Sequence, residues 1–414
     1  MGFSQALSGV NAASQQLDVV GNNIANSQTS GFKSSSVQFA DVFANSQIGL
    51  GTRVSGVLQD FSNGNLETTG RNLDLAISGT GFFRFEQNGQ VGYSRNGQLT
   101  MTAEGDLVNA QGAKIMGYGL SAGPFSAVVP GGQPVPLNIP ADDMPAQATG
   151  TETGVQASYN LDQSTDETDA TARNTVNLDD GNPGGFDVDY HYSNSFTVYD
   201  SLGNQRNTTM YFEKTANPNE WNVKVGLDGV YDSANDFTLT FDNDGQLSSA
   251  AEQNITFTTA QLGGDPADLN FTLDLKGTTQ FANDSTQNSL VQDGYSSGSL
   301  IGISIADDGT VMRNYTNEKS VSAGQIVLAN FRNPEGLKAS GDNMWAATSG
   351  SGAEVVGTAG VGQFGSVEAE TLESSNVDLT SELVNLIIAQ RNYQANTNSI
   401  RTQSEVMDQI AQLR

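Results

Sequence analysis

The side chains that could carry out catalysis are few in this sequence. His191 is the only histidine and there is no cysteine, so a zinc site built from Cys and His cannot form. A Ser-His-Asp triad would have to use His191, and little else in the sequence suggests the geometry of a triad. Ser30 and Lys33 match the S-x-x-K pattern of penicillin-recognising enzymes, but the S-D-N and K-T-G segments that act with it are absent. We therefore predict no catalytic residue and no enzymatic activity.

Ligands for a metal ion or a cofactor are also incomplete. Residues 242–245, Asp-Asn-Asp-Gly, resemble the start of a calcium loop, but the closing Glu does not follow and a hairpin turn is favoured. Neighbouring carboxylates such as Asp142 and Asp143 are common in an acidic chain and do not indicate glycoside hydrolysis. There is no Walker A loop. The sequence thus predicts no metal and no cofactor.

The charge of the chain is strongly negative and unevenly distributed. The formal net charge is −28, which argues against nucleic acid as a partner, because binding a duplex requires a basic face. Twelve of the acidic residues lie in 141–200, whereas 1–33 contain one acid, Asp18, and one base, Lys33. If copies of the chain assemble, the neutral ends suit the contacts and the acidic middle suits the outside. Acidic loops that simply aid solubility are the alternative. No stretch is apolar for long enough to span a membrane, and no Sec-type signal peptide is apparent at the N-terminus.

The two ends of the chain have the pattern of helices that pack against other helices. Apolar and small residues alternate at spacings of four and three, which is the a/d pattern of a coiled-coil seam. At the N-terminus, where a helix is expected over about 4–26, the seam comprises Phe3, Leu7, Val10, Ser14, Leu17, Gly21 and Ile24. At the C-terminus, with Asp378 as the expected N-cap, the seam includes Leu379, Leu383, Leu386, Tyr393, Ile400 and Met407. An ordinary amphipathic helix packed on a globular core is the alternative for either segment alone.

Between the ends, strand-like runs alternate with turn formers. Runs at 74–77, 81–85 and 91–95 are separated by Asn88-Gly89 and followed by Asn96-Gly97, and Asn-Gly is a strong hairpin signal. Six prolines between 124 and 145 mark a boundary. A second β-rich block spans about 150–285, and the polar, acidic segment 161–180 within it is expected to be a loop. A third block, about 290–360, could complete the first, so that the second is an insertion.

Two long motifs at opposite ends resemble the signatures of bacterial flagellar rod and hook axial proteins. The first is the stretch 17–33, and its most family-like residues are Asn22, Asn23, Asn26, Gly31, Phe32 and Lys33. The second is the stretch 373–394, with Asn376, Val377, Asp378, Gln390 and Arg391. Within the family the hook proteins are the better match, because rod proteins are shorter and lack a segment like 146–289. Another axial protein (rod or junction) and a secreted β-rich adhesin or hydrolase are the alternatives.

The resemblance implies an α+β, multidomain fold in which both ends form one coiled-coil domain and two all-β domains are nested. The implied parts are 1–28 with 372–414, a connecting segment of 29–70 with 361–371, a β domain of 71–145 with 290–360, and an inserted outermost β domain of 146–289. It also implies a curved helical homopolymer that works as an extracellular universal joint between motor and filament. The implied partners are rod, hook cap and hook–filament junction proteins and the flagellar type III export apparatus. The two helix seams are the expected self-assembly sites, and the residues named in the two motifs are the family signature.

Overall fold

The structure is a computed structural model that describes residues 2–42, 50–121, 126–166, 168 and 173–412. The chain divides into two compact units. The first, the helix-bearing unit, comprises Met1–Ala141, Ile301–Asn314 and Ser320–Arg414. The second, the inserted unit, comprises Asp142–Leu300 and Tyr315–Lys319. Neither helix of the described residues has an apolar run long enough to cross a bilayer.

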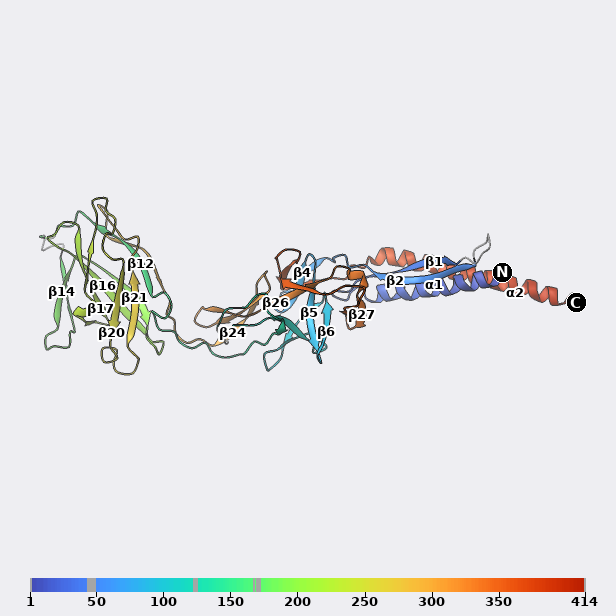
Figure 1. Cartoon of the computed structure of the whole chain (residues 1–414), viewed down its shortest axis with the longest axis horizontal. Helices are drawn as coiled ribbons and strands as arrows, with labels where there is room; N and C mark the ends of the chain where they lie inside the picture. The colour runs from blue at the N-terminus through green and yellow to red at the C-terminus, as the bar shows by residue number, and fades with distance from the viewer. Residues whose placement is uncertain (1, 43–49, 122–125, 167, 169–172, 413–414) are drawn as a thin grey trace. The chain divides into compact units, whose positions relative to one another are not determined.

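Both ends of the chain form helices, as predicted. Helix α1 (Gly2–Ala25) and helix α2 (Leu379–Gln412) lie side by side, and the hairpin of β1 (Ser35–Val42) and β2 (Gly51–Gln59) packs against α1 (Figure 1). The helices run antiparallel, because the residues that follow α1 contact those that precede α2, with Gly31 N donating to Glu373 O at 2.7 Å. Together with the β-rich remainder, this arrangement confirms the predicted α+β fold class.

The predicted cap of α2 is present. The Asp378 carboxylate accepts hydrogen bonds from Thr380 N (2.9 Å) and Ser381 N (3.2 Å), two of the backbone donors that a helix N-terminus leaves unpaired. These bonds hold the pKa of Asp378 below its usual value. Helix α2 then continues without Pro or Gly for 34 residues, about 50 Å.

The β body of the helix-bearing unit combines strands from two distant stretches of sequence. Its main sheet has the order β24-β25-β26-β10-β5-β6-β28-β27, and β26 pairs with β5 so that Leu328 lies opposite Phe83. Smaller sheets join β30-β4-β7 and β3-β31, and the buried core includes Leu75, Phe83 and Phe85. The strands are β3 (Leu66–Thr68), β4 (Asp74–Ser78), β5 (Phe82–Gln87), β6 (Gln90–Ser94), β7 (Gly97–Gln98), β8 (Thr100–Met101), β9 (Leu107–Val108), β10 (Lys114–Tyr118), β11 (Val135–Pro136), β24 (Leu300–Ile305), β25 (Thr310–Tyr315), β26 (Ser320–Asn330), β27 (Lys338–Gly341), β28 (Met344–Ala346), β29 (Val355–Thr358), β30 (Ser366–Ala369) and β31 (Thr371–Glu373).

The inserted unit is built from two five-stranded sheets and one hairpin. One sheet has the order β20-β21-β12-β22 with β23 on β12, the other has the order β15-β16-β17-β18 with β19 on β17, and β13 pairs with β14. Alternate side chains of both large sheets, including Tyr159, Phe212 and Trp221, form a single buried core. The strands are β12 (Val155–Asp162), β13 (Asn174–Leu178), β14 (Phe186–Tyr190), β15 (Tyr192–Tyr199), β16 (Gln205–Lys214), β17 (Glu220–Leu227), β18 (Val230–Tyr231), β19 (Phe237–Thr240), β20 (Glu252–Phe257), β21 (Leu269–Asp274), β22 (Thr279–Phe281) and β23 (Thr286–Gln292).

Two local predictions were wrong. The acidic segment 161–180 is not one loop: Leu161 is a buried residue of β12, and residues 174–178 form β13, whereas 167 and 169–172 lie outside the described residues. Asn88-Gly89 does form a hairpin turn, with φ of 53° and 79°. Asn96-Gly97 does not, because Gly97 is a strand residue opposite Leu75, where a Cβ would collide with the Leu75 backbone oxygen.

Asp293 stabilises the start of the inserted unit by accepting backbone hydrogen bonds. Its Oδ1 accepts from Gly150 N at 2.8 Å, and its Oδ2 accepts from the backbone N–H groups of Glu152, Thr153 and Gly154 at 2.7–3.1 Å. Burial alone raises the pKa of Asp293, but these bonds outweigh it and the pKa lies below the usual value.

We expect Asp293→Asn to lower the free energy of unfolding of the inserted unit by about 2 kcal/mol, because an amide group cannot accept at both positions. The depressed pKa means that the carboxylate contributes its full stabilisation above its unfolded pKa and loses it as the pH falls through the folded pKa. Urea unfolding across acidic pH should therefore show a shallower pH dependence in the variant. Equal pH dependence of the two proteins would contradict this role.

Candidate functional site

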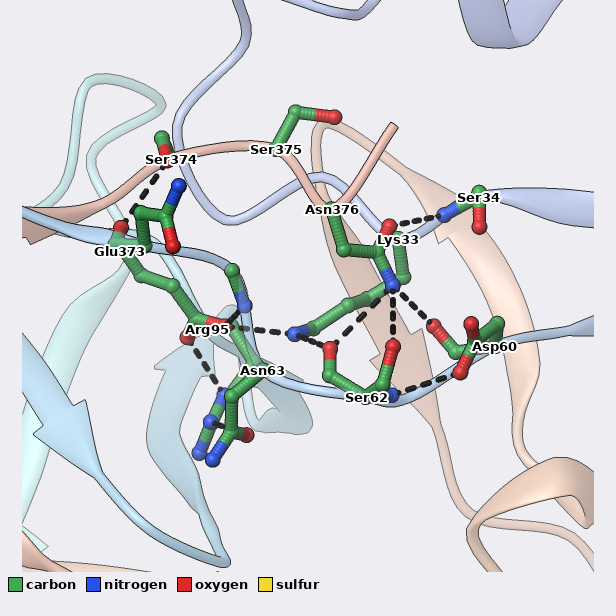
Figure 2. Close-up of polar contacts among 12 residues, drawn as sticks. Lys33, Ser34, Asp60, Ser62, Asn63, Arg95, Glu373, Ser374, Ser375 and Asn376 are labelled. Carbon is green, nitrogen blue, oxygen red and sulfur yellow. Dashed lines mark hydrogen bonds and ion pairs between the residues drawn. The ribbon is translucent and has the colours of Figure 1, made fainter. Parts of the chain in front are cut away.

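A buried charge cluster joins the two ends of the chain to the β body. The cluster comprises Lys33, which follows α1, Arg95, which follows β6, and Glu373, the last residue of β31 (Figure 2). The Glu373 carboxylate lies 2.6 Å from Lys33 Nζ and 2.8 Å from Arg95 Nε. All three side chains are at most 3% exposed. Since Lys33 and Glu373 are 340 positions apart in sequence, this contact exists only when both ends of the chain are in place.

Backbone carbonyls balance the excess positive charge of this charge cluster. Lys33 Nζ also donates to Ser62 O, and the Arg95 guanidinium donates to Gly79 O (2.9 Å), Gly81 O (2.7 Å) and the side chain of Asn63. Burial nevertheless lowers the pKa of Lys33 and of Arg95, although Glu373 acts in the opposite direction on both. Glu373 is therefore the one carboxylate that is bonded to both cations in the described cluster.

Three further signature residues make contacts around the charge cluster. The Asn376 amide accepts from Ser34 N (2.8 Å) and donates to Asp60 O (2.8 Å) and Ser62 O, so it connects the approach to α2 with both sides of the β1–β2 hairpin (Figure 2). The buried Asn23 amide exchanges two hydrogen bonds with the backbone of Ser35. Gly31 has φ of 70°, and a Cβ there would lie 2.6 Å from Asn96 N. These positions explain why the signature needs Asn, Asn and Gly.

The remaining signature residues lie at the end of α1, just before α2 and along α2. Asn26 closes the end of α1 through its bonds with Asn22 O, and Phe32 O accepts a hydrogen bond from Asn376 N. Val377 precedes the cap residue Asp378, and Gln390 and Arg391 are exposed on α2. The structure thus brings Lys33, Gly31, Asn23 and Asn376 together at one junction, whereas Gln390 and Arg391 lie away from it along the helix.

Within the single chain, the buried residues of the helix pair are not the predicted seam residues. Where the side chains of the helix pair are described, its buried residues are Ala6, Ala12, Ala13, Val20, Asn23 and Ala389. The two helices approach closely at Gly9, where a Cβ would lie 2.7 Å from the Asn396 side chain. Gly21 is exposed, and a Cβ there would meet no atom within 4 Å.

The predicted seam residues are therefore left at least partly open. Val10, Ser14, Leu17, Ile24, Leu386 and Ile400 are half-buried. Phe3, Leu7, Leu379, Leu383, Tyr393 and Met407 are exposed. A surface of this kind on a single chain is typical of an interaction site.

The residues that could have supported chemistry have structural surroundings. His191 Nδ1 accepts from Lys214 N at 3.1 Å, and its ring packs edge-on against Trp221. The segment 242–245 is a turn, as predicted, in which Asp242 Oδ1 accepts from Asp244 N and Gln246 N. Ser30 and Lys33 lie in the junction after α1. No group of three or more His, Asp and Glu side chains suited to a metal occurs among the described residues.

Three segments with glycines at fixed spacings also match sequence motifs of other protein classes. Residues 119–123 and 294–298 fit G-x-S-x-G, and 360–365 fit G-x-G-x-x-G. Hydrolase and dinucleotide motifs both require a helix directly after the turn. Strand β30 follows 360–365 and β24 follows 294–298, and the described residues after 119–123 contain no helix before β11. The surroundings of these segments therefore support neither chemistry.

Sequence reasoning missed Arg95 and Glu373 as site residues, and Gly9 as the point of close helix approach. Charged residues make up only 15% of the chain, so a charged residue directly after a strand-like run is unusual. Arg95 is such a residue, and this position could have indicated the site. A charge placed there must find a buried partner. The identity of that partner, Glu373, depends on the tertiary structure.

Models of flagellar axial proteins match most of the chain. Residues 4–33 match the flagella basal body rod protein family and 368–413 match the flagellar basal body rod FlgEFG C-terminal family. Residues 76–155 match the flagellar hook protein FlgE/F/G D1 domain, and 160–295 match the flagellar basal body protein FlaE D2 domain. The two terminal matches contain both signatures, all of α2 and most of α1.

Curated relatives are similar over the full length. The chain is 43% identical to the flagellar hook protein FlgE of Escherichia coli K12 and 44% identical to that of Salmonella typhimurium, over 100% of each chain. The protein of the same name from Treponema pallidum is 31% identical over 99% of this chain and 98% of its own. A crystal structure of Helicobacter pylori flagellar hook protein FlgE2 has a TM-score of 0.54 over 74% of this chain and 100% of its own, at 15% identity, which supports the fold alone. The chain belongs to the flagellar hook protein family, whose members are structural proteins and not enzymes.

Proposed function

We propose that this hook subunit polymerises into a curved, flexible tube that works as a universal joint, transmitting motor torque from the rod to the filament. The observation that supports this proposal is the open seam of the helix pair. The seam residues Phe3, Leu7 and Leu383 are exposed while smaller side chains make the contacts within the chain. Another copy of the chain would cover them, and packed inner helices would supply stiffness against twist.

The proposed roles of the segments follow the four parts that the family resemblance implies. Residues 1–28 with 372–414 are the inner helical part, and 29–70 with 361–371 connect it to a β domain of 71–145 with 290–360, into which 146–289 are inserted. We assign the permanent contacts to 1–33 and 372–414, and contacts that slide as the tube bends to 71–360. Polar, Gly-rich surfaces suit sliding because no single apolar anchor dominates them.

The proposed partners are other copies of the chain, the rod, the hook cap and the hook–filament junction proteins. Export through the flagellar type III apparatus would require the chain to pass unfolded through a narrow channel. The absence of cysteine favours this route, because no disulfide can form before or during passage.

Electron microscopy of the purified protein tests the proposed function. We expect curved tubes when the protein is concentrated under conditions that favour assembly. A protein that stays monomeric under all such conditions would contradict the proposal. Straight rods would favour a different axial role.

Gly21 tests whether helices of neighbouring copies approach closely. Because a Cβ at Gly21 meets no atom within the chain, Gly21→Leu should leave the single chain folded and improve helix propensity by up to about 1 kcal/mol. We expect the variant to be exported but to form no hooks. Gly9→Leu is the matched control, since it should instead disturb the packing of α1 on Asn396 within the chain. Normal hooks from Gly21→Leu would count against close approach at this residue.

A further inference from the structure

Among the exposed apolar residues of the helix pair, two groups lie on adjacent helical turns. Patch N consists of Phe3 and Leu7 on α1, which are 51% and 45% exposed. Patch C consists of Leu383, Val384, Ile387 and Ile388 on α2, each between 45% and 52% exposed. Large apolar side chains on adjacent helical turns form continuous surfaces, and such surfaces mark interaction sites.

The two patches lie at opposite ends of the helix pair. Because the helices are antiparallel and Gly9 lies beside Asn396, Phe3 and Leu7 lie beside roughly residues 398–402 of α2. The centre of patch C lies about 14 residues before residues 398–402 in the sequence of α2. At 1.5 Å per residue the two patches are separated by about 20 Å along the helix axis.

The surroundings of both patches favour burial. No charged residue occurs in 2–17 or in 383–390. By the same antiparallel register, Arg401 of the paired helix lies beside patch N and Asp18 lies beside patch C, so docking one patch on the other brings opposite charges together and places no charge within either patch.

Symmetry decides which surface covers each patch. A patch that binds its own equivalent on a second copy gives a closed dimer, whereas an open helical polymer needs contacts between two different surfaces. In the proposed function this chain assembles as an open polymer, and it offers two different apolar patches displaced along one axis.

We propose that patch N of one copy docks on patch C of the next copy, and that docked copies are displaced by about 20 Å along the helix axis. This inference rests on the proposed function, since its occupant is a second copy of this chain, and it names the surfaces that meet. Phe3 and Leu7 then determine the axial offset between neighbours, while the small buried residues of α1 hold the helix pair together within each copy.

Disulfide cross-linking tests the contact directly, because the chain has no native thiol. The double variant Leu7→Cys/Ile387→Cys cannot close a bond within one copy, since its two positions are about 15 Å apart along the axis. After mild oxidation of assembled tubes, we expect a ladder of covalent oligomers on a non-reducing gel, and a Leu7–Ile387 linked peptide by mass spectrometry. Phe3→Cys/Val384→Cys is a second pair in case the first has unsuitable geometry.

Matched controls separate this contact from random collision. Each single variant should give no ladder. Leu7→Cys/Val361→Cys places the second thiol at a residue that is 62% exposed outside the helix pair and should also give none. If a variant assembles poorly, co-assembly with an excess of wild-type chain restores tubes in which linked peptides can be detected.

The outcomes are distinguishable. Tubes in which neither pair cross-links, or in which Ile387→Cys links only to itself, would overturn the docking of patch N on patch C while leaving the proposed function intact. A wild-type chain that forms no tubes would overturn the proposed function and this inference with it. Electron cryo-microscopy of tubes should independently show neighbouring helix pairs displaced by about 20 Å, and the absence of any such pair would contradict the proposal.

Discussion

Replacing Glu373 by Gln is expected to lower the free energy of unfolding of the helix-bearing unit by about 3–5 kcal/mol. The substitution keeps the size of the side chain but removes the only carboxylate bonded to both Lys33 and Arg95 in the charge cluster. Two buried cations would then depend on neutral acceptors alone. The amide would also present a donor towards Lys33 Nζ or Gly64 N, both of which now donate to the Glu373 carboxylate.

The two tryptophans make this measurement specific. Trp345 is buried in the helix-bearing unit and Trp221 in the inserted unit, so urea unfolding followed by fluorescence in a Trp221→Phe background reports the helix-bearing unit alone. Glu67→Gln is the matched control, because Glu67 is exposed on β3, opposite β31, which carries Glu373. We expect the control to stay within about 0.5 kcal/mol of wild type. Equal unfolding midpoints for the two variants would show that the cluster contributes little.

Deleting residues 1–20 is expected to abolish polymerisation and to leave both β regions folded. The deletion removes patch N and the buried Ala6, Ala12, Ala13 and Val20, so the contact face of α2 loses its partner. The two large apolar cores contain no residue before Leu75 and should survive. The charge cluster also survives, because Lys33 lies beyond the deletion.

Electron microscopy and sedimentation would measure polymerisation, and the fluorescence of Trp221 and Trp345 would measure folding. Both unfolding transitions should remain cooperative in the truncated chain. A truncated chain that polymerises normally would refute the assignment of permanent contacts to the N-terminal helix. Loss of both transitions would show instead that α1 is needed for folding.

Local patterns in the sequence predicted much of the secondary structure. The 3-4 spacing at each end, the Asp378 cap and Asn88-Gly89 act over a few residues, and the structure has helices, cap and turn at these places. The sequence predicted a turn equally at Asn96-Gly97 because the dipeptide is the same. The structure places Gly97 against the backbone of Leu75, a contact between distant segments that no local pattern contains.

The terminal motifs by themselves determined the family, and the sequence identified Lys33, Gly31 and Asn376 as important without giving their partners. Tertiary structure alone decided that Lys33 meets Glu373 and Arg95, and that Ala6, Ala13 and Val20 rather than the seam face the chain's own core. The physical reason is that the spacing of apolar residues specifies which faces of a helix avoid water. Whether such a face meets the same chain or another copy depends on the packing of segments that lie hundreds of residues apart.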